Sequence, residues 1–543
     1  MTIKDKQKKI KAISELLSKK ISSRAELMAV KRKLAKKYGQ VILANSEILN
    51  EYKNRLLTGA ARGSAALEKI LRKRSVRTMS GIAPVAVLTK PYPCPGECAY
   101  CPSELNVPQS YLSNEPAVMR AIRCNYDPYK QVELRLRALE ANGHEPTKIE
   151  LIVIGGTWSV LPENYKYWYI TRCFKAANEF GGSRKLKVKS QKFNSKFKIK
   201  IIKKLLFSEQ KKNESARYKI IGITLETRPD YINDKELLEM RELGATRVEL
   251  GVQAVDDKIL KLNKRGHGVA EIAQATEFLK NYGFKVTYHI MPGLPGATAK
   301  KDLAMFKLLF SDQRFQPDQL KFYPTIVTRG SLLYKWWRAG KYKPYSDKVL
   351  QNLIVQCKKA VPPYVRIIRL IRDIPGESIM AGNLITNLRQ VMKDRGVKCR
   401  CIRCREAREE KFSIFNFQFS KIIYQASNGI EYFIQATDKK DETLYGFCRL
   451  RLATRNPQPA THNPIKNAAL IRELHVYGEL VSMGRKKKVQ HAGLGKLLMQ
   501  EAEKIARRES YKKIAVIAGV GVRGYYRKLG YKLQSSYMVK NLV

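Results

Sequence analysis

Residues 94–102 read CPGECAYCP, a C-x3-C-x2-C motif formed by Cys94, Cys98 and Cys101. Three cysteine thiolates hold three irons of a [4Fe–4S] cluster. The fourth iron then keeps an open position, which a substrate-binding cluster needs and a closed electron-carrier cluster lacks. Zinc is the alternative metal, but a compact three-cysteine loop directly after the first of six predicted strands disfavours it. The motif therefore predicts an iron–sulfur site at the end of the first strand.

Short β-rich runs around this loop predict the fold that carries it. The candidate strands are residues 85–88, 149–154, 221–226, 247–252, 285–290 and 320–323. The stretches between them are long enough for a helix and a loop each, and this strand–helix repetition predicts a parallel sheet. Six such units predict a barrel or partial barrel, in which the chemistry lies at the carboxyl ends of the strands.

Glycines and polar residues close the second to fifth predicted strands. They are Gly155, Gly156, Glu226, Arg228, Gln253 and residues 289–292. Buried polar side chains at successive strand ends suit an active site better than a hydrophobic core. A purely structural role is the open alternative for each of them.

A second chemical site is predicted near the carboxyl end of the chain. Gln490, Gly493 and Gly495 form a Q-x-x-G-x-G motif that opens an amphipathic helix over residues 494–507. Backbone N–H groups at such a helix start bind anions, and glycines let the ligand approach closely. Flanking strands complete an α+β domain. These predicted strands are residues 446–452, 471–476 and 514–517.

The cysteine motif, with Tyr100 just before its third cysteine, resembles that of the radical S-adenosylmethionine (SAM) superfamily. The resemblance implies that the open iron binds SAM, whose cleavage yields a 5′-deoxyadenosyl radical. Gly155 and Gly156 fall where that superfamily often has Gly-Gly-Glu, so Thr157 departs from its pattern. The SAM contacts expected here are Gly155, Gly156, Glu226, Arg228 and Gln253.

The carboxyl-terminal motifs resemble those of the GNAT acetyltransferases, which implies acetyl-coenzyme A (acetyl-CoA) as a ligand. Either Tyr525 or Tyr526 would then lie beside the thiol of coenzyme A, where its hydroxyl could act as a general acid. Together with the motifs at 372–375 (RDIP), 472–478 (RELHVYG) and 525–528 (YYRK), the chain resembles the Elongator catalytic-subunit family from about residue 84 to 543. A stand-alone archaeal member fits the heavy use of Lys and Ile.

That resemblance implies a transferase that installs a carboxymethyl-type group from acetyl-CoA at C5 of the tRNA wobble uridine. C5 of uracil is a poor nucleophile for acyl transfer, so a carbon radical is a sensible route. The resemblance assigns catalytic roles to Lys148, Tyr525 and Tyr526. The acetyl-CoA contacts expected are Lys148, Glu473, Leu474, His475, Val476, Gln490, Gly493, Leu494, Gly495, Lys496 and Tyr526.

The charge balance predicts a polyanionic partner. The 543 residues carry 103 Lys/Arg and 48 Asp/Glu, a formal net charge of +55. Residues 1–80 hold 21 Lys/Arg and 6 Asp/Glu, and their apolar residues recur at helical spacing. The insertion 184–217 holds 13 Lys/Arg and 2 Asp/Glu. Nucleic acid is the commonest such partner, whereas an anionic membrane surface, a compositional bias or plain solvated faces are the alternatives. Candidates to hold the anticodon are Lys321, Tyr323, Arg369 and Arg372.

The predicted fold is a multidomain α/β chain. Its regions are a basic helical tRNA-binding region (1–80), a partial (βα)6 radical SAM barrel (81–385), a cysteine-rich linker (386–410) and a GNAT domain (411–543). Cys399, Cys401 and Cys404 predict a structural zinc knuckle, with free thiols as the alternative. The cysteine usage, and the absence of a signal peptide or a ~20-residue apolar run, predict a soluble cytoplasmic protein. An unidentified electron donor is implied, and a homodimer is left open.

Two rival functions remain at this stage. A protein lysine acetyltransferase would use the barrel as a scaffold, but a chain of +55 would repel basic histone-type tails and attract tRNA. An RNA-binding module with degenerate enzyme domains is disfavoured by the complete cysteine and helix-start motifs.

Overall fold

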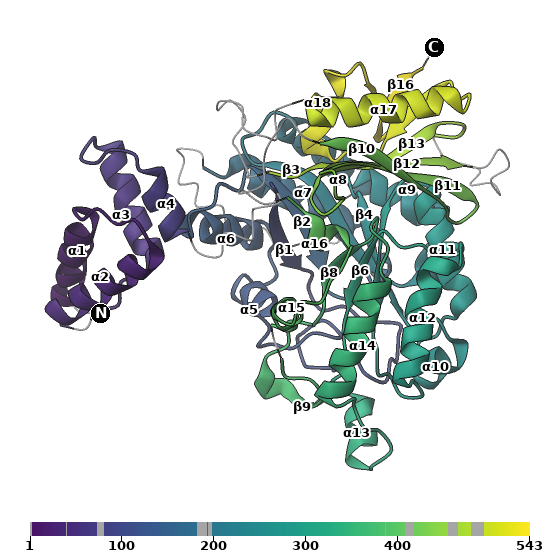
Figure 1. The fold of residues 1–543 in the computed structure, drawn as a ribbon, viewed down its shortest axis with the longest axis horizontal. Coiled ribbons are helices and arrows are strands. Elements are labelled where there is room, and N and C mark those ends of the chain that lie inside the picture. The colour runs from purple at the N-terminus through teal and green to yellow at the C-terminus, as the bar shows by residue number, and fades with distance from the viewer. Residues whose placement is uncertain are drawn as a thin grey trace.

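The computed structural model describes residues 3–39, 41–72, 81–181, 193, 198–385, 387–407, 417–453, 465–478 and 493–542. Along the chain lie a small helical unit, a helix-covered parallel sheet and a mixed sheet with its own helices (Figure 1). Within the described ranges, no helix is long and apolar enough to cross a membrane.

The amino-terminal unit is helical, as the apolar spacing predicted. Its helices are α1 (Ile3–Leu17), α2 (Arg24–Lys37), α3 (Asn45–Leu57) and α4 (Ala65–Leu71). They enclose a separate core that includes Leu16, Leu34 and Ile48. Figure 1 shows this unit beside the parallel sheet, where α6 (Pro128–Ala141) meets α3.

The central sheet contains seven parallel strands in the order β1-β2-β3-β4-β5-β6-β8. They are β1 (Ala83–Leu88), β2 (Lys148–Ile154), β3 (Lys219–Thr227), β4 (Arg247–Gln253), β5 (Lys285–Ile290), β6 (Gln319–Phe322) and β8 (Arg366–Arg369). The six predicted strands correspond to β1 to β6, although the sixth was predicted to end at Tyr323, one residue beyond β6, and β8 is a seventh that the sequence analysis missed. Strands β1 and β8 form the two edges, so the predicted partial barrel is confirmed.

Helices cover the outer face of the sheet, which explains why β4 is buried almost throughout. They include α5 (Pro116–Arg123), α6, α7 (Glu163–Glu179), α8 (Ile199–Asn213), α9 (Asp234–Glu242), α11 (Val269–Asn281), α12 (Ala299–Ser311) and α14 (Asp347–Ala360), while α10 (Asp257–Leu262) follows β4 and α13 (Leu332–Arg338) projects beyond the sheet (Figure 1). Helix α8 occupies about half of the basic insertion at 184–217. It packs on α7, and its Glu209 carbonyl accepts a hydrogen bond from Asn178. Most of residues 184–197 lie outside the described residues.

The linker carries α15 (Leu388–Asp394) and α16 (Ile402–Arg405), and two short strands, β7 (Val327–Thr328) and β9 (Ile379–Ala381), pair with each other. The last sheet runs β10-β11-β12-β13-β14-β16-β15. Its elements are β10 (Gln418–Gln425), β11 (Gly429–Thr437), β12 (Leu444–Ala453), β13 (Ala469–Val476), α17 (Leu494–Arg508), β14 (Lys513–Val516), α18 (Arg523–Arg527), β15 (Lys532–Gln534) and β16 (Tyr537–Asn541).

Strands β13 and β14 pair only from Ala469 to Ile471 on β13, where their partners are residues 514–516. The second half of β13 therefore diverges from β14 and leaves a splayed edge. A short 3-10 turn after β14, Val520–Val522, packs on the beginning of β3. A side chain at Gly519 would overlap the Ile221 carbonyl, so glycine permits this close contact.

A buried ion cluster joins the two sheets. Asp318 precedes β6, whereas Arg472 and Arg449 come from β13 and β12, and all three side chains are at most 1% exposed. Glu431 of β11 and Lys280 of α11 complete the cluster. Buried charges are tolerated only when paired, so the cluster fixes how the carboxyl-terminal domain sits on the barrel.

Candidate active site

One cavity of about 660 Å³ runs through the inside of the barrel and is lined by both domains. The loop with Cys94, Cys98 and Cys101 lines one part of it, and Glu473 and His475 of β13 line another. Its wall includes 11 Arg or Lys and 6 Asp or Glu side chains. A positively charged wall of this kind suits an anionic ligand.

The cysteine loop lies between β1 and α5, at the carboxyl end of the sheet. Cys98 and Cys101 contact each other, and that hydrogen bond, aided by the Arg265 guanidinium, lowers the pKa of Cys98 to about 5. Nη1 of Arg265 lies 3.0 Å from the Cys98 sulfur, and Cys94 faces the Thr157 hydroxyl at 3.9 Å. A thiolate-rich loop of this kind fits a [4Fe–4S] cluster, whose ligands must be deprotonated.

Several buried polar atoms on the cavity wall have no hydrogen-bond partner among the described residues, and three of them belong to the cysteine loop or to the predicted SAM contacts. These three are the hydroxyl of Tyr100, Nη1 of Arg228 and Oε1 of Gln253. Each unmet polar atom costs about 1–3 kcal/mol. Gln253 also has φ of 70°, a left-handed conformation that a non-glycine residue rarely adopts and that is common at functional sites. These features fit a polar ligand such as SAM beside the cysteine loop.

The two glycines after β2 have different surroundings. A side chain at Gly155 would overlap Thr89, and its φ is 135°, so glycine is required there by packing alone. Gly156, with φ of 95°, lines the cavity, and a side chain there would meet only the Gln109 carbonyl, at an ordinary contact distance of 3.8 Å. Gly156 is therefore the better placed of the pair for a ligand contact.

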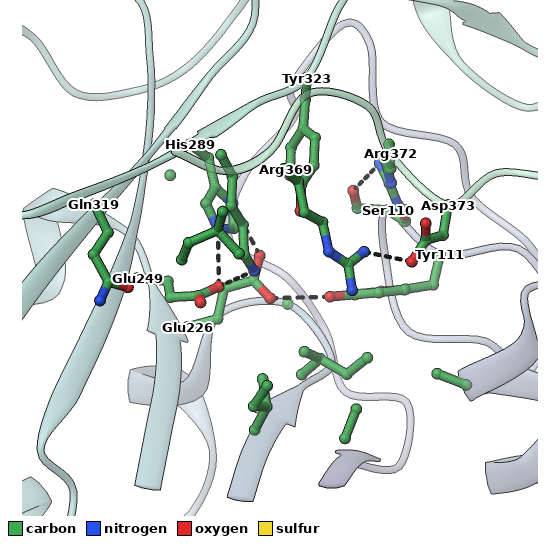
Figure 2. A pocket seen from close by; sticks show the side chains of 18 of the residues that line it. Ser110, Tyr111, Glu226, Glu249, His289, Gln319, Tyr323, Arg369, Arg372 and Asp373 are labelled. Atoms are coloured by element: carbon green, nitrogen blue, oxygen red, sulfur yellow. Dashed lines mark hydrogen bonds and ion pairs between the residues drawn. The ribbon is translucent and has the colours of Figure 1, made fainter. Parts of the chain in front are cut away.

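Four strands contribute a layer of interacting charges to the cavity wall (Figure 2). His289 of β5 lies 3.4 Å from Glu226 through Nδ1 and 3.0 Å from Glu249 through Nε2. Lys321 pairs with Glu249, and the Tyr111 hydroxyl donates to Glu226 at 2.9 Å. Burial alone would raise the pKa of Glu249, but Lys321 and His289 hold it well below its usual range.

The four residues predicted to hold an anticodon all line this cavity: Lys321, Tyr323, Arg369 and Arg372. Arg369 pairs with Asp373, and Nη1 of Arg372 donates to the Ser110 hydroxyl at 3.1 Å (Figure 2). Arginine and tyrosine side chains are those that stack on splayed single-stranded bases.

At the other end of the cavity, β13 presents Glu473 and His475. Glu473 accepts from Arg449 at 3.0 Å and lies 3.6 Å from Lys285. The His475 ring lies 4.4 Å from that of Tyr477, and its Nε2 has no partner among the described residues. Burial lowers the pKa of His475 to about 4, so the imidazole is neutral at pH 7.

The start of α17 meets β13 and α18. Gly493, with φ of 89°, precedes the helix and provides no side-chain cap, so its first N–H groups are available to an anion. A side chain at Gly495 would stand 2.8 Å from the Tyr525 hydroxyl and 3.7 Å from Val476. Lys496 is exposed and Leu494 is buried in the core below. The predicted Gln490 lies outside the described residues.

The two tyrosines of α18 have different surroundings. Tyr525 is 38% exposed, and burial of the rest raises its pKa to about 12. Tyr526 is 6% exposed and packs in the domain core against Tyr531. The hydroxyl of Tyr525, rather than that of Tyr526, therefore lies at the start of α17. Leu474 packs on the same core.

Lys148 stands apart from the other predicted residues. It is the first residue of β2, half-buried, and burial lowers its pKa. It does not line the cavity described above. Its neighbour in the sheet is Lys219 of β3, against which Gly521 of the carboxyl-terminal domain packs. Lys148 thus lies one strand away from the carboxyl-terminal domain. It is at the amino end of β2, whereas the cysteine loop lies at the carboxyl end of the sheet.

The three linker cysteines form a compact cluster. The sulfurs of Cys399, Cys401 and Cys404 all lie within 4.8 Å of one another. Cys401 is buried and lies at the start of α16, which packs on β8. The donor set matches the sulfur ligands that zinc prefers.

Family models match both domains. The Radical SAM superfamily matches residues 93–309, its C-terminal domain 317–396, and the Acetyltransferase (GNAT) family 401–531. The chain is 44% identical over 479 residues to the tRNA uridine(34) acetyltransferase of Dehalococcoides mccartyi, covering 87% of this chain and 100% of that protein. It is 38% identical over 563 residues to Elongator complex protein 3 of Schizosaccharomyces pombe, covering 98% of each. The chain therefore belongs to the family of tRNA uridine(34) acetyltransferases and Elongator complex protein 3.

A solved structure of an Elongator complex protein 3 relative agrees. The Methanocaldococcus infernus Elp3 lacking residues 1–46 superimposes with a TM-score of 0.71 at 38% identity, covering 86% of this chain and 100% of that one. The resemblance to the Elongator catalytic-subunit family, the radical SAM barrel and the GNAT domain are therefore confirmed.

Several wall residues of this Elongator-family site escaped the sequence analysis. Glu249 and Arg247 alternate within β4, and charges at alternate positions of a buried strand were a usable signal. Arg265 and Tyr111 come from loops with no motif, so only the fold brings them to the cysteines and to Glu226.

Proposed function

We propose that this chain installs a carboxymethyl-type group at C5 of the wobble uridine of tRNA, with acetyl-CoA as the carbon source. The observation that carries the proposal is the single cavity lined both by the cysteine loop and by β13 of the GNAT domain. The names of its relatives, tRNA uridine(34) acetyltransferases, support the same substrate.

The residues divide the work along the cavity. Cys94, Cys98 and Cys101 would hold the [4Fe–4S] cluster, while Arg228 and Gln253 offer their unpartnered atoms to SAM. Bound together, these groups supply a 5′-deoxyadenosyl radical able to take a hydrogen atom from the acetyl methyl group. The enclosing walls exclude water from that chemistry.

The GNAT side would hold the acetyl donor. The start of α17 binds the pyrophosphate through its N–H groups, and the splayed edge of β13 leaves the backbone of residues 473–476 available to the pantetheine arm. Lys321, Tyr323 and Arg369 would hold the uridine between the two cofactors. Lys148 would contact acetyl-CoA from the barrel side.

The test is anaerobic reconstitution with iron and sulfide, then incubation with tRNA, SAM and acetyl-CoA labelled with ¹³C in its methyl group. Mass spectrometry of the nucleosides should show a labelled carboxymethyl-type uridine, absent with Cys98→Ala. Acetylated lysine on a basic peptide, without a change in tRNA, would instead favour the scaffold alternative.

We further infer that Cys399, Cys401 and Cys404 hold a structural zinc. Purified protein should then contain about one zinc per chain, lost in Cys401→Ser and kept in Cys357→Ser. A cytoplasmic location and a homodimer stay predictions of the sequence.

A further inference from the structure

Two elements hydrogen-bond to the backbone of the cysteine loop at Ala99, the residue that follows Cys98. The Ala99 N–H donates to the Asn263 carbonyl at 3.1 Å, at the end of α10. The Ala99 carbonyl accepts from the N–H of Leu333 in α13 at 2.7 Å. Helices α10 and α13 therefore flank the residue between two predicted cluster ligands, each one hydrogen bond away.

Both helices carry exposed cations. The six that lie on them or directly after them are Lys258, Lys261, Lys264, Lys335, Arg338 and Lys341. Within the described part of the chain, none of the six takes part in an ion pair. The aspartates that begin α10 are engaged with the backbone, because Asp256 accepts from the Ile259 N–H and Asp257 from the Val269 N–H.

The same two helices also carry apolar side chains. Leu262 is 49% exposed. Trp336 and Trp337 of α13 are half-buried, and the Trp337 ring lies 5.8 Å from that of Tyr334. An apolar centre with a charged rim, over a modest area, is typical of weak, transient redox interfaces.

The cysteine loop is only partly covered, because Cys94 and Cys101 are half-buried and Glu97 is exposed. Cys98 is 8% exposed and Ala99 is fully buried. At this buried part of the loop, α10 and α13 each provide a route of one hydrogen bond from the surface to Ala99. Figure 1 shows α13 as a projection at the opposite end of the molecule from α17, so this surface lies away from the acetyl-donor helix.

We propose that the surface formed by α10 and α13 is the docking site of an acidic ferredoxin that reduces the cluster. The proposal rests on the proposed function only in requiring the cluster. One electron leaves the ferredoxin, which is oxidised by one electron, and the [4Fe–4S]²⁺ cluster becomes [4Fe–4S]⁺; no atom is transferred. The positive rim complements an acidic partner and steers its approach.

The experiment compares two charge-reversed holoenzymes with the wild type. The test variant carries Lys261→Glu, Lys335→Glu and Arg338→Glu. The control carries Lys504→Glu, Arg508→Glu and Lys512→Glu, exposed cations at or beyond the end of α17 whose reversal changes the net charge equally. The probe is a reduced plant-type [2Fe–2S] ferredoxin, and cluster reduction is followed by electron paramagnetic resonance after rapid freezing.

The test variant should be reduced by ferredoxin at least about tenfold more slowly than the control, while dithionite reduces all three proteins at equal rates. Raising NaCl from about 50 to about 500 mM should slow reduction of the wild type by ferredoxin but not by dithionite. Equal ferredoxin rates in all three proteins, or no reduction of the wild type by ferredoxin, would overturn the proposal.

An RNA role for the same surface is separated by tRNA affinity. The proposal expects the test variant to bind tRNA as the control does, whereas lost tRNA affinity with unchanged ferredoxin reduction would make the surface an RNA contact instead. A failure of the proposed function looks different, because the wild-type cluster would be reduced normally while no modified uridine forms.

Discussion

Arg472 of β13 and Asp318 of the barrel form a bidentate ion pair in which both side chains are 0% exposed. Nη1 of Arg472 donates to Oδ1 of Asp318 at 2.9 Å. Burial alone would raise the pKa of Asp318, but Arg472 and the neighbouring Lys280 lower it to about 2. The two catalytic domains are thus joined by a charge that stays ionised at any working pH.

Removing that charge should unfold the domain interface. Asp318→Ala leaves Arg472, Lys280 and Arg449 buried without their shared partner, which costs about 3–5 kcal/mol. Urea unfolding followed by fluorescence measures the loss. The matched control is Glu133→Ala, which removes an exposed pair with Arg137 on α6 and should cost at most about 0.5 kcal/mol. Similar losses in both variants would contradict a joining role for Asp318.

This cluster shows what the sequence did not reveal. In β12, Arg449 and Arg451 alternate with apolar residues, which is the pattern of a strand with one solvent-facing side. That face instead packs on the barrel, and the partner Asp318 lies more than a hundred residues earlier in the chain. Pairing at such a separation leaves no local signal, so the sequence predicted both domains but not the ion cluster that joins them.

Strand β8 was missed for a similar reason, because one of its arginines has partners that are distant in the sequence. Its sequence, RIIR, is short and has arginine at each end. Arg366 is tolerated inside because Tyr477 and Glu406 accept its hydrogen bonds, each at 2.9 Å. The motifs with a local cause, the cysteine loop and the glycines of α17, were predictable because their chemistry requires fixed spacing.

The cluster assignment predicts a loss of colour. Cys98→Ala should abolish the brown absorbance near about 400 nm and most of the bound iron after reconstitution, because one of three thiolate ligands is gone. Cys124→Ala removes a buried thiol at the end of α5 that does not line the cavity, and it should keep the full iron content. Full cluster content in Cys98→Ala would show that the motif does not ligate iron.

Deleting residues 1–80 should weaken tRNA binding by well over tenfold. The four helices have their own core, so the barrel should remain folded, and their lysines and arginines would no longer release counterions from phosphates. Filter binding across a range of salt concentrations should show a flatter slope of log affinity against log salt. An unchanged slope would move the RNA contact to α8 and the basic residues around it.

Acid should destabilise the protein through His475. Burial holds its pKa near 4, below the ordinary 6.5, so the folded state binds fewer protons than the unfolded state between these values. The free energy of unfolding therefore falls as the pH falls from 6.5 to 4, by at most about 3 kcal/mol from this group. In His475→Asn that part of the pH dependence should be missing from urea unfolding curves, whereas a curve parallel to the wild type would exclude it.

Tyr525 is the better candidate to protonate the leaving sulfur of coenzyme A. Its hydroxyl lies beside Gly495 at the start of α17, and burial raises its pKa to about 12, so it carries its proton at neutral pH. Loss of a general acid typically costs 10²–10⁴-fold in rate. Tyr525→Phe should therefore lose at least about a hundredfold of the tRNA-stimulated release of coenzyme A, while keeping tRNA affinity and the cluster.

Tyr526→Phe is the matched comparison, because its ring packs in the domain core and its hydroxyl is not the one at the helix start. We expect less than about a threefold change in coenzyme A release, measured by thiol titration, since the aromatic packing is kept. The reverse result, with release lost in Tyr526→Phe and kept in Tyr525→Phe, would return the acid role to Tyr526. That result would also mean that the donor binds deeper in the splay between β13 and β14 than the start of α17 indicates.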